Sequence, residues 1–457
     1  MKLKIVTLLA VIFIASICYS QADSIYSFSL NEACDYALTH NYEAINAELE
    51  IKRAKKKVWE TTAIGLPQVQ GSLTYQHIPG DIPTINFGDQ MLPLFSLLDS
   101  LHPGTFSSMG DDMSSGESAI AVKNSTTYGF TVSQLVFNGE YIVGLQAAKT
   151  FLMLSENAQD KKQLDTKEAV TSSYYTILAL EKNKAIIDSS IENLISTLNE
   201  FRLMNQSGFI EDTDVDQIEL TLRNTQNAGR TLDQQIELSY NLLKILLGID
   251  LESSINLTQN IEEFLISINV NNPTFSEFNI NNNIDYRLLE TQEKISKLSL
   301  KRERSKYLPL VSAFYSYTDI TNKADFDFTI NHIIGLNVSL PIFSSWQRNS
   351  QIQQAKIEFE KQKNLSALAS DNIKLQLQQA EYDLKKSIEK FSNEQFNIGL
   401  SKKIYNKILI KHKEGIASSL DLSQAHNQYL VSSSNYTNSI LELLNSKLNY
   451  DKILNNL

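Results

Sequence analysis

The chain has 457 residues, and its 52 acidic and 41 basic side chains leave a formal net charge of −11. This acidic balance argues against a nucleic-acid partner. After the N-terminal segment no run of about 18 apolar residues occurs, so we expect no helix to span a bilayer. If the chain enters a membrane, it does so with strands.

The N-terminal segment has the pattern of a secretory signal peptide. Two lysines precede an apolar run over residues 5–17, and small and polar residues follow. Such a run is too short for a spanning helix. We expect residues 1–22 to be removed, with cleavage after Ser20 or Ala22. Residues 23–457 would then be exported with Cys34 as their only cysteine, which excludes an intramolecular disulfide.

Four segments alternate apolar and polar residues with period two, which is typical of strands with one apolar face. In LPQVQGSLTYQH, residues 66–77, Val69, Leu73 and Tyr75 alternate with polar residues. The strands are predicted near residues 68–77, 127–137, 310–318 and 333–343. The residues expected on the apolar, lipid-facing side are Val69, Leu73, Tyr75, Tyr128, Phe130, Val132, Tyr315, Leu336 and Val338.

The second half of the chain repeats the first. The start LPQV at 66–69 recurs as LPLV at 308–311, and YGFTVSQLVFNG at 128–139 matches IGLNVSLPIFSS at 334–345. From the second match onward the offset is nearly constant: it is 206 between residues 128 and 334 and 207 between Gly208 and Gly415. We infer an internal duplication. Its parts are repeat one at 28–248, an Asn-rich linker with little local structure at 249–283, and repeat two at 284–457.

Each repeat contains a very long helix and a return helix. The long helices are predicted at 142–205 and 352–413, and about 64 residues make a rod of roughly 95 Å. The return helices are predicted at 214–247 and 421–454, with Gly248 and Asn455 ending them. Apolar residues at seven-residue spacing predict coiled-coil packing. One such set is Leu377, Leu384, Phe391, Ile398 and Tyr405.

Strands of about ten residues have the length needed to cross a bilayer. Backbone groups in lipid must all be paired, so spanning strands close into a barrel, and membrane barrels begin near eight strands. Several chains must therefore share one barrel, unless the strands form a half-buried sheet of a soluble protein. The long connection at 77–126 is expected outside the cell, with the helices in the periplasm.

The chain resembles the TolC family of outer-membrane channels. The resemblance rests on the paired LP-x-V strand starts, the duplicated hairpins, and the turns SGFIEDTDV at 207–215 and EGIASSLDL at 414–422. It implies an α+β membrane protein of the cell outer membrane. Three copies would share a 12-stranded β-barrel, four strands per chain, continuous with a long periplasmic α-helical coiled-coil tunnel.

The resemblance also implies partners and a function. A homotrimer in outer-membrane lipid would dock a periplasmic adaptor (membrane fusion protein) and an inner-membrane pump of RND or ABC type. It would conduct substrates passively, in a tripartite efflux pump or a type I secretion system. The rival interpretation is an exported coiled-coil adhesin or a periplasmic adaptor, although an adaptor would need lipoyl-like and β-barrel modules that the sequence does not show.

Signatures of catalysis are missing from the sequence. The six histidines are dispersed, and neither HExxH, GxSxG nor a Gly-rich phosphate loop occurs. We therefore expect no enzyme, no catalytic residue, no cofactor and no metal site. For the basic run at 52–57 three interpretations are open: a docking patch, a lipid-facing basic cluster or a solvated helix face.

Acidic residues crowd the start of the first return helix. Acids favour a helix N-terminus, and Thr213 or Asp214 is expected to cap this one. The same acids would also line a periplasmic mouth, once per subunit. They are Glu211, Asp212, Asp214 and Asp216.

The resemblance implies that contacts between the turns close this mouth. Family members use an Arg and a Tyr of the second turn to reach an Asp of the first. Asp214 matches that Asp, but Ala417 and His412 stand at the Arg and Tyr positions. Asp421 matches one acid of the constricting ring, whereas Gln424 stands at the second.

A substitute contact is expected from the heptad pattern. His412 lies seven residues after Tyr405, on the packed face of the helix, and Lys413 follows it. Two interpretations are open: His412 or Lys413 bonds to Asp214 and replaces the missing lock, or the basic residues form a solvated cluster that suits the negative end of the helix dipole. Because histidine changes charge near neutral pH, acid is expected to strengthen the closed state.

The two turns are the predicted adaptor-docking sites. Each has a glycine that permits a tight reversal, followed by an apolar residue left exposed at the tip. The four residues are Gly208, Phe209, Gly415 and Ile416.

Overall fold

The computed structural model describes residues 25–80, 84–85, 87–101, 103, 118–119, 122–268, 277–323 and 329–457. The predicted signal peptide lies outside the described residues. The chain divides into two compact units. The helical unit comprises Met1–Arg53, Met153–Glu293 and Gln362–Leu457, and the strand unit comprises Ala54–Leu152 and Lys294–Lys361.

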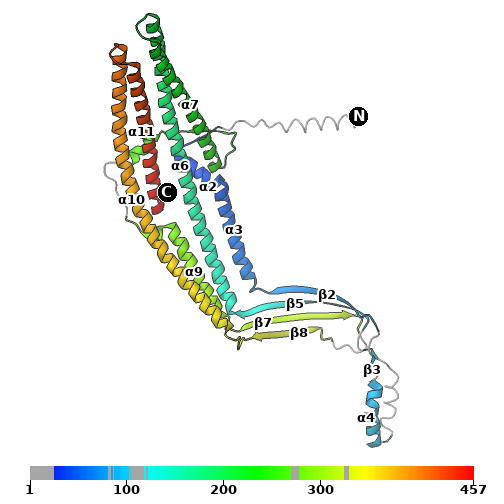
Figure 1. Ribbon diagram of the computed structural model, residues 1–457. Helices are drawn as coiled ribbons and strands as arrows, with labels where there is room; N and C mark the ends of the chain where they lie inside the picture. Colours follow the sequence, from blue (N-terminus) through cyan, green and yellow to red (C-terminus); the bar gives the residue numbers. More distant parts are fainter. Residues whose placement is uncertain are drawn as a thin grey trace, which may run out of the picture. The chain divides into compact units, whose positions relative to one another are not determined.

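The strand unit contains an antiparallel sheet of four strands (Figure 1). Its strands lie in the order β2 (Gln68–His77), β5 (Asn124–Asn138), β7 (Leu310–Thr321) and β8 (His332–Ser339). β5 and β7 extend beyond the predicted bounds, whereas β8 ends at Ser339 instead of residue 343. Pro341 has no N–H to donate, and Ser345 and Trp346 have positive φ angles, so the ladder stops before them.

The register places alternate residues of all four strands on the same face. Val69 pairs with Val132, Val132 with Tyr315, and Tyr315 with Ile334. Directly paired residues of an antiparallel ladder project to the same side. By the same alternation, all nine residues predicted to face lipid share this face. Thr131 and Ser316 are hydrogen-bonded to each other on the opposite face, at 3.1 Å.

The connection between β2 and β5 is not only a loop. It contains β3 (Thr84–Ile85) paired with β4 (Ser118–Ala119), and the helix α4 (Phe87–Leu101). These elements were not predicted, because Pro93 inside the helix reads as a breaker.

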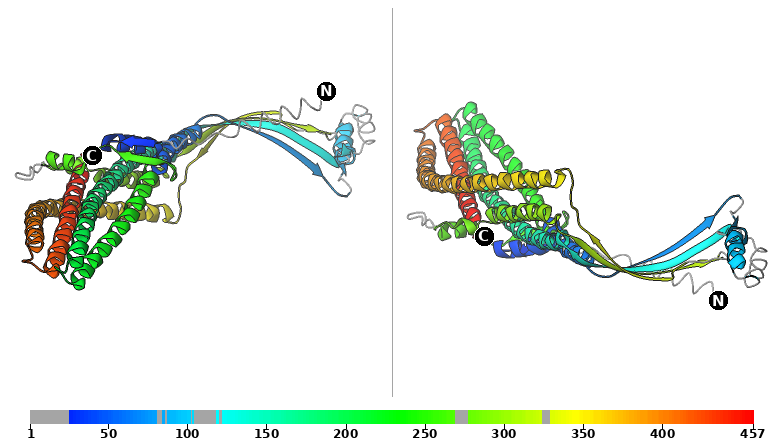
Figure 2. Two further views of the ribbon diagram at one scale, coloured as in Figure 1. Left: turned by 90° about the horizontal axis from the view of Figure 1, so that it is seen from above. Right: turned by 90° about the horizontal axis from the view of Figure 1, so that it is seen from below.

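The helical unit is built from two long hairpins. In the first, α6 (Gly139–Gln206) is followed by α7 (Asp212–Leu247). In the second, α10 (Gln347–Lys413) is followed by α11 (Ser419–Leu454). α7 and α11 pack against each other, green and red in Figure 2. Gly248 and Asn455 adopt the predicted left-handed conformation at the ends of the return helices.

The shorter elements complete the fold. The helices α2 (Leu30–His40) and α3 (Tyr42–Ala63) precede β2, and α9 (Ile284–Ser305) precedes β7. The linker carries more structure than predicted: β6 (Ser254–Leu257) pairs in parallel with β1 (Ile25–Phe28), and α8 (Ile261–Ser267) and the 3₁₀ turn Ile280–Asn282 follow. The chain is mostly helical and, with its separate sheets, of the α+β class.

The core of the helical unit lies between the hairpins and α2. Its fully buried side chains include Tyr174 and Ile177 of α6, Leu243 of α7 and Ile440 of α11. On α10 the heptad face is turned inward, and its buried members are Leu384, Phe391, Tyr405 and His412. Within the described ranges, no helix combines the length and apolar character needed to cross a membrane.

Candidate functional site at the helical turns

The first hairpin reverses at Gly208, between α6 and α7. Gly208 has a φ of +77°, a left-handed conformation that a side chain would strain. Its N–H donates to the Asn205 carbonyl at 2.9 Å, and the Phe209 N–H donates to the Met204 carbonyl at 2.9 Å. These two bonds form a Schellman motif and satisfy the last carbonyls of α6.

The second hairpin reverses in the same way at Gly415, where φ is +72°. The N–H of Gly415 donates to the His412 carbonyl at 2.9 Å, and that of Ile416 donates to the Lys411 carbonyl at 2.8 Å. The two turns therefore have the same hydrogen-bonding pattern. After each glycine the apolar side chain is left in solvent, because Phe209 is 78% exposed and Ile416 is 70% exposed.

Capping explains most of the acids at the turns. Glu211, not Thr213 or Asp214, is the N-cap of α7, and the Asp214 carboxylate accepts the Glu211 N–H at 3.4 Å. Ser418 caps α11, and the Asp421 carboxylate accepts its N–H at 2.9 Å. The Ser418 hydroxyl also donates to the Asp421 carboxylate, at 2.7 Å, and this bond together with the one from the N–H holds the pKa of Asp421 below its ordinary value. Asp421 therefore has a structural role at the N-terminus of α11, independent of any role at a periplasmic mouth.

The remaining acidic residues at the turns are solvent-exposed, as is Gln424 at the second position of the predicted constricting ring. Asp212 accepts a hydrogen bond from the Asn205 side chain at 2.9 Å, which ties the two sides of the first turn together. Asp216 and Gln424 lie on exposed positions in the second turns of α7 and α11.

His412 joins the two hairpins, but not through Asp214. The residue is only 5% exposed, and its ring stacks on Phe201 of α6, with ring centroids 4.4 Å apart. Its Nε2 lies 3.0 Å from the Ser419 hydroxyl, and its Nδ1 has no hydrogen-bond partner among the described residues. Lys413 pairs with Glu200, with 3.0 Å between Nζ and Oε2. The predicted bond to Asp214 is therefore not made within the described chain.

The electrostatics of His412 also reverse the predicted effect of acid. Burial lowers the pKa of His412, and the nearby carboxylates of Asp214 and Asp421 only partly oppose this. A lowered pKa means that the packed state favours the neutral ring. Acid is therefore expected to weaken this contact between the hairpins, not to strengthen it.

A second histidine, which the sequence reasoning did not select, lies deeper between the same helices. His426 of α11 is fully buried, and burial lowers its pKa to about 4. Its ring nitrogens lie 3.4–3.5 Å from the Ser190 and Thr225 hydroxyls, and its ring contacts Tyr405 edge-on. The sequence gives no signal for His426, because α11 is rich in small polar residues and shows no clear apolar period around this position.

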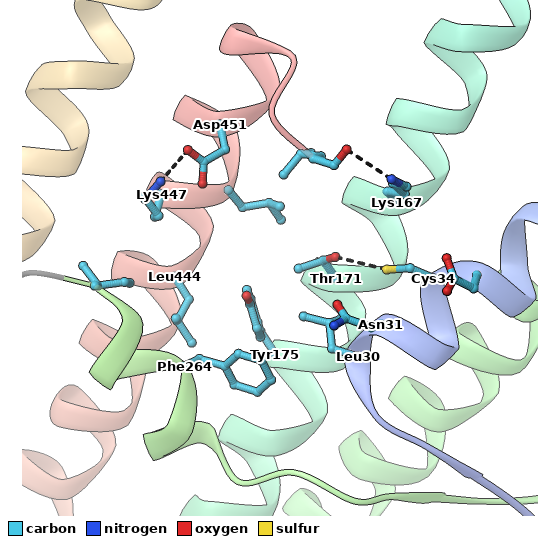
Figure 3. Close-up of a pocket in the computed structure, with 14 residues that line it drawn as sticks. Leu30, Asn31, Cys34, Lys167, Thr171, Tyr175, Phe264, Leu444, Lys447 and Asp451 are labelled. Atoms are coloured by element: carbon cyan, nitrogen blue, oxygen red, sulfur yellow. Dashed lines mark hydrogen bonds and ion pairs between the residues drawn. The ribbon is translucent and has the colours of Figure 1, made fainter. Parts of the chain in front are cut away.

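The helical unit also contains a cavity of about 570 Å³ beside Cys34 (Figure 3). The Cys34 sulfur lies 3.6 Å from the Thr171 hydroxyl, and Lys167 donates to the Leu457 carbonyl at 3.1 Å. Burial raises the pKa of the Cys34 thiol, so the reactive thiolate is disfavoured. Among the described residues, no cluster of His, Cys, Asp and Glu has the geometry of a metal site.

Sequence and structure comparisons differ in their outcome. No family sequence model and no curated protein sequence matches the chain. Solved structures do match, and they match nearly the whole chain. The Campylobacter jejuni CmeC outer membrane channel matches with a TM-score of 0.72 at 16% identity, over 93% of this chain and 85% of that chain.

Two further structures agree. The outer membrane protein VceC from Vibrio cholerae has a TM-score of 0.70 at 14% identity, over 93% of this chain and 96% of its own. The Neisseria gonorrhoeae MtrE outer membrane channel, in its open state, has a TM-score of 0.69 at 14% identity, over 93% of this chain and 88% of that chain. The chain has the TolC-type channel fold. The unmatched 7% of this chain is too small to contain either of the two units.

Proposed function

We propose that this chain forms an outer-membrane exit duct, which conducts substrates passively from a periplasmic adaptor and an inner-membrane pump to the outside. The observation that carries the proposal is the exposed apolar face of the sheet. Val69 is 71% exposed, Leu73 74% and Ile334 84%. A continuous apolar face of this kind is costly in water and stable against lipid.

The edges of the sheet support assembly from several copies. Among the described strands, β2 and β8 are each paired on one side only. In lipid an unpaired edge costs several kcal/mol per backbone group, so β8 of one copy is expected to pair with β2 of the next. Three copies would give 12 strands, and the TolC-type fold favours this number.

A second seam for the same assembly lies on α10. Large apolar side chains are exposed there at multiples of seven residues, on the side away from the core. This repeat is typical of a helix that packs against another helix by knobs into holes. The residues are Leu368, Leu375, Tyr382 and Phe396. A helix of a neighbouring copy is the occupant we propose, as part of a periplasmic coiled-coil tunnel.

The turns supply a surface for the adaptor. Phe209 and Ile416 are held in solvent by hydrogen-bonded reversals, so docking would order little additional backbone. The gate is proposed to lie at the same level, with Asp214, His412, Lys413, Asp421 and Gln424 near the mouth. An RND or ABC pump would provide the energy, and the choice between efflux and type I secretion would depend on that partner.

Fractionation of cells that express the full chain tests the proposal. We expect heat-modifiable trimers that require detergent for extraction from the outer membrane. With Cys34 replaced by Ser, single cysteines in β2 and β8 should form disulfides between copies, whereas a pair placed in the interior strands β5 and β7 should form them within one copy. A monomeric protein released from the periplasm by salt would contradict the proposal and favour an adhesin or an adaptor.

A further inference from the structure

The strand unit holds an open cavity of about 780 Å³ between the helices α6, α9 and α10. Basic side chains dominate its lining, and four of the five come from α9. They are Lys294, Lys297, Lys301, Arg304 and, from α10, Lys356. Among the described lining residues Glu360 is the only carboxylate, so five cations face one anion.

The spacing along α9 explains how these cations converge. Positions 294, 297, 301 and 304 follow one another by three, four and three residues, which places them on one face of a helix. Like charges at such spacings destabilise a helix. Lys301 donates to the Gln146 side chain of α6 at 3.0 Å and so fixes one wall of the cavity.

Neighbouring cations outside the cavity are neutralised. Arg302 Nε donates to Glu140 at 2.7 Å, and Lys306 pairs with Glu303 at 2.8 Å. By contrast, in the described chain no carboxylate lies within 4.0 Å of Lys297, Arg304 or Lys356. In a chain with 52 acids and a net charge of −11, this uncompensated charge indicates an anion from outside the chain.

The cavity also has an apolar side. Leu298, Leu300 and Phe359 line it beside the cations, and the Leu300 side chain is buried. We propose that the cavity binds an amphipathic anion, with a phosphate or carboxylate at one end and an apolar body at the other. Arg304 would hold the anionic group with two parallel hydrogen bonds, and the two lysines would add charge.

Two sources could supply this ligand: a membrane phospholipid or a soluble amphiphile that passes along the duct. Arg304 lies at the end of α9, six residues before β7 begins at Leu310. If the sheet spans the membrane, lipid headgroups would lie within about two helical turns of the cavity. The lipid source rests on the proposed function, whereas the anion site does not.

Native mass spectrometry of the full chain in uncharged detergent tests the site. The probes are phosphatidylglycerol and phosphatidylcholine with identical acyl chains, dodecyl phosphate, and inorganic phosphate. Lys297→Gln/Lys356→Gln and Arg304→Gln should each weaken phosphatidylglycerol binding roughly ten-fold, as loss of charge-assisted hydrogen bonds does. Lys55→Gln/Lys56→Gln removes the same charge from exposed positions of α3 and is the matched control. Lys297→Arg/Lys356→Arg should retain binding.

The outcomes separate the alternatives. A cavity-dependent preference for phosphatidylglycerol supports the lipid source, and cavity-dependent binding of dodecyl phosphate without that preference supports a soluble amphiphile. Inorganic phosphate binding as tightly as both would overturn the amphipathic assignment. Equal losses in the cavity and control variants would overturn the site. If the protein fractionates outside the outer membrane while the cavity variants still lose dodecyl phosphate, the proposed function fails and the site stands.

Discussion

The ring of His412 in α10 lies nearly parallel to the ring of Phe201 in α6, with 15° between their planes. This stack joins the two hairpins one to two turns before their reversals. Glu200 and Lys413 are the adjacent residues and form an ion pair beside it. An exposed pair of this kind contributes about 0–1 kcal/mol, so the buried rings are expected to dominate the contact.

The first prediction concerns this stack. In a duct reconstituted in planar bilayers, Phe201→Ala and His412→Ala should each raise the open probability, because each removes one ring of the same contact. The double variant should add little, since the coupling energy of an aromatic pair is about 0.5–1.5 kcal/mol. Fully additive effects would exclude the stack from gating. An effect of Asp214→Ala as large as that of His412→Ala would indicate a contact of Asp214 with another copy.

The second prediction concerns pH. The pKa of His426 falls to about 4 in the folded state, below the ordinary value of 6.5. Between these values the unfolded chain binds a proton that the folded chain does not, so stability falls as pH falls through this window. The side chains that contact the His426 ring are Ser190, Thr225 and Tyr405, and none of them carries a negative charge to compensate a protonated ring.

The loss should reach on the order of 3 kcal/mol per chain near pH 4. Chemical denaturation followed by circular dichroism at pH 7.5 and 4.5 measures it. His426→Gln should lower stability at pH 7.5 but flatten its pH dependence. An unchanged slope in His426→Gln would refute the assignment.

The third prediction distinguishes the two faces of the sheet. Phe130→Arg places a charge on the apolar face and should cost about 2–4 kcal/mol per chain if that face meets lipid. The adjacent Thr131→Arg projects to the polar face and should assemble normally and change single-channel conductance. The yield of heat-modifiable trimers measures assembly. Equal yields for the two variants would show that the proposed strand phase is wrong.

The fourth prediction concerns docking. Phe209→Ser and Ile416→Ser should leave trimers intact, because both side chains are exposed and neither supports the fold. Export should be lost, because the adaptor loses its apolar anchor. Co-purification with a cross-linked adaptor provides the direct readout, and Leu238→Ser, at another exposed apolar helix position, is the control. Normal export from a folded Phe209→Ser protein would exclude that residue from docking.

The elements with a strong period were predictable from the sequence. Apolar residues at every second position predicted the four long strands, and apolar residues at seven-residue spacing predicted the buried face of α10. The pairing of β1 with β6 was not predictable, because each strand has four residues and over 200 residues separate them. Such short segments carry too little periodicity to be recognised.

The position of His412 in the candidate site could be predicted from the sequence, but its contact partner could not. The heptad put His412 on the packed face correctly. It did not decide between Asp214 and Phe201, because the partner depends on which face of α6 lies opposite, and tertiary packing sets that. The basic cavity could not be predicted for a related reason. The cations of α9 are spread over three helical turns and form no contiguous run in the sequence. The contiguous basic run at 52–57, by contrast, lies on a solvated helix face.

The uneven strand lengths have a consequence for biogenesis. β5 has 15 residues and β7 has 12, but the edge strands β2 and β8 have only 10 and 8. Within one copy the longest ladder forms in the interior, between β5 and β7. If copies join through β8 and β2, as proposed, each joint would depend on the shortest strands. An isolated copy would carry two open edges that can pair with any other strand, including the wrong one. Association between copies should therefore be the slow step of maturation, and a chaperone that shields these edges until the copies meet would raise the yield more than one that accelerates helix formation.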